Sequence, residues 1–137
     1  MQSERIENKS LNHGSQGASM MMQGRIAELD IEKELDELQR SPAWHNGIAR
    51  KVLIRYPDFQ ITLRAMKANA RIPEHRNPGR ICVQTVRGHI RMHADGRFFD
   101  LPQGKALVLD LAVTHDVEAL EESAFLLTGA LPESSAR

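Results

Sequence analysis

The clearest pattern along the chain is an alternation of apolar and polar residues that begins after Gly47. Alternation indicates a half-buried antiparallel strand, because successive side chains of a strand point to opposite faces. Residues 59–68 show it best: Phe59, Ile61, Leu63 and Ala65 form one face, and Gln60, Thr62 and Arg64 form the other. Further strands are expected within 48–56, 80–88, 89–97, 97–105, 105–112 and, as a pair, 115–131. Such regularly spaced short strands predict an all-β sandwich or barrel.

Turn signals separate these strands. Asp95-Gly96 is a strong hairpin signal, because both residue types accept the backbone conformation of a two-residue turn. Pro57-Asp58 and the Pro102–Gly104 segment are also expected to be turns, and residues 71–78 are interpreted as a loop. The turns therefore divide residues 47–131 into the strands of one domain.

A helical pattern precedes the strands. Its apolar residues recur every two to four positions and are Ile26, Leu29, Ile31, Leu35 and Leu38. Asp30 is the expected N-cap, and Ser41-Pro42 is expected to end the helix. Trp44 follows at once and is expected to pack on the domain. The pattern predicts an amphipathic helix that braces the barrel.

The remaining segments are predicted to lie outside the folded domain. Residues 1–24 are rich in Ser, Asn, Gln and Gly and carry few apolar residues before Met20, so we expect them to be disordered. The predicted organisation is a disordered tail over 1–24, a short helix and connection over 25–46, a barrel over 47–131, and a C-terminal tail over 132–137.

Composition narrows the class of protein. The chain has 137 residues, which suits one domain, and its 18 Lys and Arg balance 18 Asp and Glu. A net charge of zero argues against a nucleic-acid partner. No segment approaches the roughly 20 apolar residues that cross a bilayer, so no membrane partner is expected. The single cysteine, Cys82, cannot form an intramolecular disulfide; it is expected to be inert packing, and the chain is expected to be cytoplasmic.

Two segments resemble the paired motifs of the cupin superfamily. They are PEHRNPGRICVQTVRG, which contains His75 and Gly88, and GKALVLDLAVTHDVEA, which contains Gly104 and His115. The hairpin between them carries the Asp95-Gly96 turn. The resemblance covers about residues 67–127, and residues 25–131 are similar to small single-domain bacterial cupins. It implies a double-stranded β-helix, the jelly-roll barrel of cupins, with one short N-terminal helix.

The resemblance also implies a metal site that this sequence does not fully provide. Metal-binding cupins hold the ion with three histidines and one glutamate. Counting from His75 places the first histidine of the motif on Pro73, and counting back from Gly88 places the glutamate on Ile81. Only His75 and His115 remain as ligands for a divalent transition metal such as Fe, Mn, Ni or Zn. Two imidazoles hold such an ion weakly, and whether one binds stays open.

The same resemblance implies that His75 and His115 point into the barrel from facing sheets. Strand alternation then predicts that the same pocket is lined by Ile81, Val83, Val117 and Ala119, which makes its walls apolar. One hypothesis is a module that binds a small, largely apolar molecule, with the two histidines as polar anchors. The alternative is a metal-dependent enzyme such as a small dioxygenase or isomerase. The sequence leaves open whether the protein is an enzyme.

A homodimer is also expected, because small cupins commonly pair through their sheets. The strand at 89–94 is predicted to turn Ile90 and Met92 inward, which leaves His89 and His93 on the outer face. The outer face carrying Gln84, His89 and His93 is the candidate contact surface.

Overall fold

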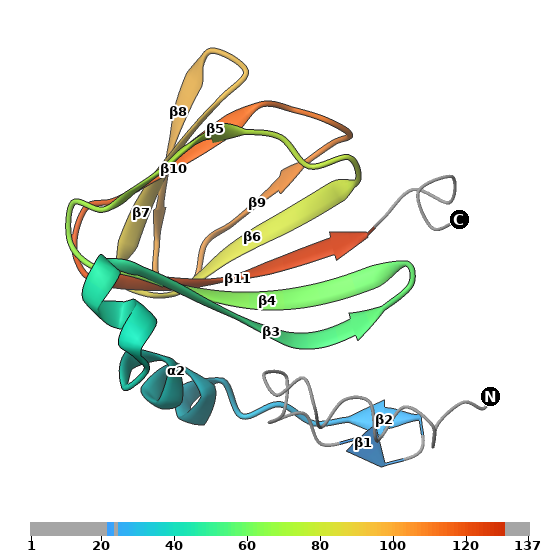
Figure 1. Cartoon of the computed structure of the whole chain (residues 1–137). Coiled ribbons are helices and arrows are strands. Elements are labelled where there is room, and N and C mark those ends of the chain that lie inside the picture. Colours follow the sequence, from blue (N-terminus) through green and yellow to red (C-terminus); the bar gives the residue numbers. More distant parts are fainter. Residues whose placement is uncertain (1–21, 24, 131–137) are drawn as a thin grey trace.

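Two antiparallel β-sheets face each other and enclose the interior of the domain (Figure 1). The computed structural model describes residues 22–23 and 25–130. Most of the predicted N-terminal tail and all of residues 132–137 lie outside the described residues. The arrangement is the jelly roll that the sequence predicts, with one short α-helix before it.

The larger sheet has five strands in the order β3-β4-β11-β6-β9. Their bounds are β3 Ile48–Tyr56, β4 Phe59–Met66, β6 Arg80–Arg87, β9 Ala106–Leu109 and β11 Ser123–Ala130. The C-terminal strand β11 lies at the centre, between β4 and β6. Strand β11 therefore links the β3–β4 hairpin to β6 and β9 within this sheet.

The smaller sheet has four strands in the order β5-β10-β7-β8. Their bounds are β5 Arg71–His75, β7 His89–Ala94, β8 Arg97–Pro102 and β10 His115–Ala119. Strand β5 corrects the sequence analysis, which interpreted residues 71–78 as a loop. It is an edge strand that pairs only with β10, and an edge tolerates Pro73 because one side of the strand needs no ladder hydrogen bonds.

The helix forms where the sequence predicts it. Helix α2 spans Ile31–Gln39, and the Asp30 side chain accepts a hydrogen bond of 3.1 Å from the Lys33 backbone N–H at its N-terminus. The 3-10 helix η2, Pro42–Asn46, follows directly. Ile26 lies outside the helix, because β1 (Met22–Gln23) pairs with β2 (Ile26–Ala27) before it. Within the described residues, no helix has the length and apolar content of a membrane span.

Two separate apolar clusters stabilise this arrangement. One fills the space between the sheets and includes the buried Met66, Val83, Ile90, Met92 and Phe125. The other lies between α2 and the outer face of the larger sheet and includes Leu35, Leu38, Leu53, Leu63 and Ala65. Strand β4 contributes to both clusters, with Leu63 and Ala65 beneath the helix and Met66 inside the barrel. Both of its faces are therefore covered.

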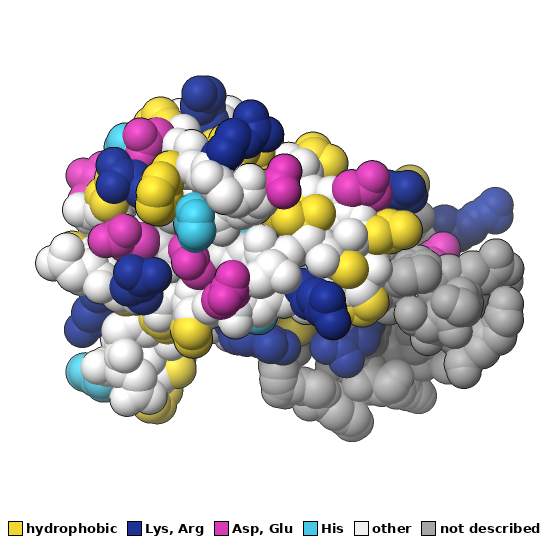
Figure 2. All heavy atoms as spheres, turned by 90° about the horizontal axis from the view of Figure 1, so that it is seen from above, with side chains coloured by type: hydrophobic (Ala, Val, Ile, Leu, Met, Phe, Trp, Pro, Cys, Tyr) yellow, Lys and Arg dark blue, Asp and Glu magenta, His cyan; other side chains and the backbone are white. Residues whose placement is uncertain are grey.

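The predicted hairpin between β7 and β8 is present. Asp95 and Gly96 both have positive φ, 53° and 71°, as a type I′ turn requires. Ile90 and Met92 are fully buried, which confirms the predicted inward face of β7. His89 and His93 lie on its other face, where Figure 2 shows acidic and basic side chains interspersed. Gln84 belongs to β6 of the other sheet, so the three residues of the predicted contact surface do not share one face.

Candidate functional site

The two candidate histidines lie side by side on the smaller sheet. His75 ends β5 and His115 begins β10, and they are direct partners in the antiparallel ladder. Their ring centroids are 4.3 Å apart at an interplanar angle of 62°. This corrects the expectation that they come from facing sheets: the chain brings them together as cross-strand neighbours.

Backbone carbonyls fix how both rings are protonated. Nδ1 of His75 lies 2.9 Å from the Pro73 carbonyl oxygen, and Nδ1 of His115 lies 2.9 Å from that of Val113. A carbonyl oxygen only accepts, so each Nδ1 carries the proton and donates it. In the neutral rings, each Nε2 is consequently an acceptor. The pair therefore offers two acceptor nitrogens, one on each ring.

Burial keeps His115 neutral. Its side chain is 3% exposed, and this burial lowers its pKa below the ordinary value of 6.5. The hydrogen bond to the Val113 carbonyl and the charge of Asp116 oppose that shift, while a protonated His75 adds to it. His115 is thus an acceptor at Nε2 at neutral pH.

A small cavity lies against the two histidines. It has a volume of about 20 Å³ and opens toward the surface, so it holds one water-sized group. Val83 and Val117 line it together with His75 and His115, as the alternation of β6 and β10 predicts. The other lining residues are Arg64, Ile72, Met92, Phe125 and Leu127.

Ile81, also predicted to line this pocket, lines a neighbouring cavity instead, and Ala119 is fully buried in the apolar cluster between the sheets. That cavity has a volume of about 90 Å³, and its other lining residues are Gln60, Thr62, Asn77, Pro78, Gly79, Leu127, Gly129 and Ala130. The two cavities share Leu127. Strand β4 lines both cavities: Thr62 lines the larger one and Arg64 the smaller one. We refer to these two neighbouring cavities, which extend from the histidine pair to the β5–β6 loop, as the trough.

Arg64 is the site residue that the sequence analysis does not identify. Alternation along β4 separates a polar face from an apolar face, and the polar face of a half-buried strand normally faces solvent. Here the apolar face lies under α2, and the polar face, with Gln60, Thr62 and Arg64, lines the trough. The available signal was the amphipathic helix, which needs an apolar sheet face to cover.

The donor set does not fit a resident metal ion. Within the described residues, no group of three or more His, Cys, Asp or Glu side chains gathers as a metal site. His75 and His115 supply two nitrogen ligands, whereas stable sites use three or four. Arg64 lines the same cavity, and the positive charge of its guanidinium disfavours a divalent cation there. A tightly held metal would need ligands that these residues do not provide.

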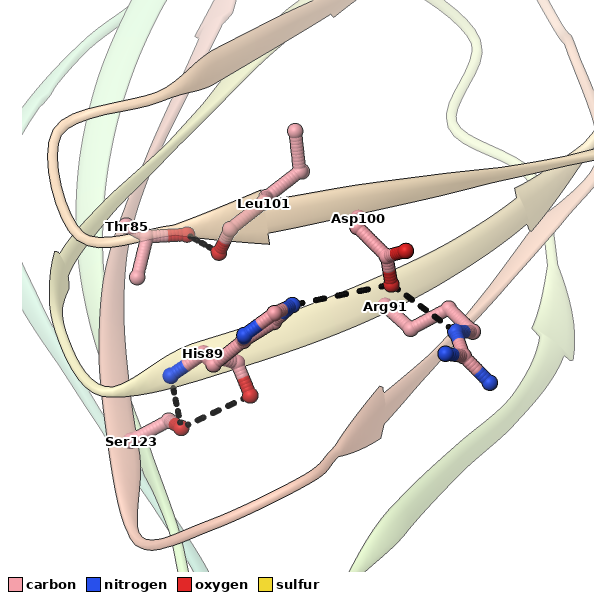
Figure 3. Close-up of polar contacts among 6 residues, drawn as sticks. All are labelled: Thr85, His89, Arg91, Asp100, Leu101 and Ser123. Atoms are coloured by element: carbon pink, nitrogen blue, oxygen red, sulfur yellow. Dashed lines mark hydrogen bonds and ion pairs between the residues drawn. The ribbon is translucent and has the colours of Figure 1, made fainter.

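A second group of polar residues looks like a nucleophile, a base and an acid but is not arranged as one. His89 Nε2 lies 3.5 Å from Asp100 Oδ1, and Arg91 Nε donates to the same oxygen at 2.9 Å (Figure 3). Ser123 Oγ accepts from the His89 backbone N–H at 2.9 Å rather than bonding the imidazole. The serine hydroxyl therefore holds the backbone at the start of β7, and it is not hydrogen-bonded to the His89 imidazole that would act as its base.

Comparisons with known proteins support the fold. No family model matches the sequence, and no curated protein matches it either. The conserved SPY1581 protein of Streptococcus pyogenes has a similar structure, with a TM-score of 0.60 and 23% identity over 63% of this chain and 75% of that one. KdgF from Halomonas has a TM-score of 0.58 and 23% identity, over 65% and 84%.

A larger enzyme is also similar. Salicylate 1,2-dioxygenase from Pseudoaminobacter salicylatoxidans, solved with gentisate, has a TM-score of 0.67 and 14% identity over 74% of this chain and 32% of that one. Other similar structures are described as cupins. At these identities the similarity shows a shared fold.

Proposed function

We propose that this chain, which has the cupin fold, binds a small organic molecule inside its barrel without a resident metal. The observation that carries the proposal is the pair of imidazoles at 4.3 Å, both held by backbone carbonyls so that Nε2 accepts. A suitable partner is a hydroxyl group, whose single proton is donated to Nε2 of one of the two rings. The rest of the ligand would lie in the trough toward Ile81.

The lining of the cavity beside the two histidines supports this proposal. Apart from Arg64 and the two histidines, every residue that lines the smaller cavity is apolar. Apolar walls with a few placed polar groups are typical of small-molecule sites. A metal-dependent dioxygenase or isomerase, the alternative that the sequence leaves open, would need a fuller ligand set than these residues supply.

Replacing His115 with phenylalanine tests the proposal. The ring shape stays and Nε2 is lost, so we expect affinity for a hydroxyl-bearing probe such as glycolate to fall about tenfold. The measurement is the dissociation constant from two-dimensional NMR titration of the full chain at millimolar glycolate. In the wild type, the chemical-shift changes caused by glycolate should be largest for residues around His75 and His115.

The matched control is His45→Phe, which alters an exposed histidine of η2. It should leave the affinity unchanged. Equal affinity in wild type and His115→Phe, or glycolate shifts far from the barrel interior, would refute binding at the histidine pair.

A further inference from the structure

Arg64 carries a positive charge into the wall of the barrel. It lies on β4 between Thr62 and Met66, which face the barrel interior, and it lines the cavity beside the two histidines. The residue is half-buried, and its Nε is buried with no hydrogen-bond partner among the described residues. A buried donor without an acceptor costs free energy, so this arrangement calls for an acceptor from elsewhere.

No acid of the described residues balances this charge. Arg64 takes part in none of the ion pairs between described residues, and no Asp or Glu lines either cavity. Its ladder neighbour on β3 is Arg50, a like charge. Burial, and then Arg50, lower the pKa of the guanidinium, which still stays charged at neutral pH. The end of the trough beside the histidines therefore carries a positive charge that no carboxylate of the described residues balances.

We infer that Arg64 binds a carboxylate group of the ligand, and that the ligand is a small hydroxycarboxylic acid. The inference rests on the proposed function, because the hydroxyl group is assigned to Nε2 of His75 and His115. The guanidinium presents paired N–H donors that match the two oxygens of a carboxylate. One compact site thus recognises both groups of the molecule.

The size of the cavity favours a carboxylate over a phosphate. The enclosed volume beside Arg64 is only about 20 Å³ and opens toward the surface, so a carboxylate of three heavy atoms, with the rest of the ligand at the opening, is accommodated more easily than a phosphate of five. The adjoining 90 Å³ has room for several further atoms. Asn77 Oδ1, buried there without a partner among the described residues, would accept a hydrogen bond from a polar group at the far end of a longer acid.

Three small probes separate the two halves of the inference. Glycolate carries both groups, glycolamide keeps the hydroxyl and loses the charge, and acetate keeps the charge and loses the hydroxyl. We expect the full chain to bind glycolate about 10- to 100-fold more tightly than glycolamide, because the bond to Arg64 is charge-assisted. Acetate should bind with intermediate affinity.

The Arg64→Gln variant should lose that preference and bind glycolate and glycolamide equally. The variant should fold, because it removes an uncompensated charge from a partly buried position; its thermal unfolding midpoint verifies this. The matched control is Arg40→Gln, which removes the same charge from an exposed arginine at the C-terminal end of α2, on the outer side of the larger sheet. It should keep the wild-type preference for glycolate.

Each outcome decides one claim. Equal binding of glycolate and glycolamide by the wild type, or an unchanged preference in Arg64→Gln, would overturn the role of Arg64 and leave the proposed function standing. Displacement of glycolate by inorganic phosphate at lower concentration than by acetate would overturn the claim that Arg64 prefers a carboxylate group. If acetate binds and glycolate and glycolamide do not, the claim that a ligand hydroxyl group donates to the histidine pair is overturned, and the proposed function with it.

Discussion

Replacing Lys51 with methionine is expected to lower the free energy of unfolding by about 3 kcal/mol. Lys51 Nζ lies 2.7 Å from Oε1 of Glu34, a helix α2 residue that is 3% exposed, and 3.0 Å from Oε1 of Glu37. The substitution removes the ammonium group that lies beside the buried Glu34 carboxylate, which costs more than the pair itself contributes. Urea unfolding at neutral pH, followed by circular dichroism, measures the loss.

Two further variants separate charge from packing in this contact. Glu34→Leu combined with Lys51→Met should recover most of the stability, because no buried charge remains. Lys105→Met, at an exposed turn, should stay within about 0.5 kcal/mol of wild type. If Lys51→Met unfolds at the wild-type urea concentration, the helix is not held to the sheet by this contact.

The same contact predicts how stability depends on pH. The hydrogen bond and charge of Lys51 lower the pKa of Glu37, and burial opposes this shift. A carboxyl group whose pKa is lowered by folding stabilises the protein above its unfolded pKa. That contribution is lost as the pH falls through the folded value. The difference in stability between wild type and Lys51→Met should therefore shrink in acid.

Replacing Gly88 with alanine is also expected to cost about 3 kcal/mol or more. Gly88 joins β6 to β7 with a φ of +81°, and a Cβ there would overlap the Glu122 carbonyl oxygen and Ser123 Oγ. Ser123 Oγ accepts from the His89 N–H and donates to a nearby carbonyl, so it cannot move without breaking these bonds (Figure 3). The backbone strain at Gly88→Ala and the loss of the Ser123 hydrogen bonds therefore both lower the free energy of unfolding.

Gly104→Ala is the matched control for this effect. Gly104 has a similar φ of +94°, but nothing lies within 4 Å of a Cβ placed there. It should lose only the conformational cost, about 1 kcal/mol. Equal losses in the two variants, measured by thermal unfolding, would show that crowding at Ser123 is not the cause.

The fold was largely predictable because its signals are local. Alternation, the Asp95-Gly96 turn and the Asp30 cap each depend on a few neighbouring residues, and all three are present in the structure. Strand β5 was missed because its pairing with β10 is a contact between distant segments. Pro73 and the charges around it are tolerated there only because β5 lies at a sheet edge.

The site was predictable only in part, for the same reason. The motif spacing picks out His75 and His115, but it cannot say that they are cross-strand neighbours rather than members of facing sheets. Arg64 has no motif. Its inward direction follows from α2 covering Leu63 and Ala65, a contact between segments far apart in the sequence. Pairing of two such chains stays a prediction.

The most direct test is a crystal structure of the full chain grown with both glycolate and Zn²⁺, with anomalous data collected at the zinc edge. The account predicts glycolate in the trough, with its carboxylate at the Arg64 guanidinium and its hydroxyl at Nε2 of His75 or His115, and no anomalous peak between the rings. A strong zinc peak coordinated by both Nε2 atoms, with Arg64 turned away, would contradict it.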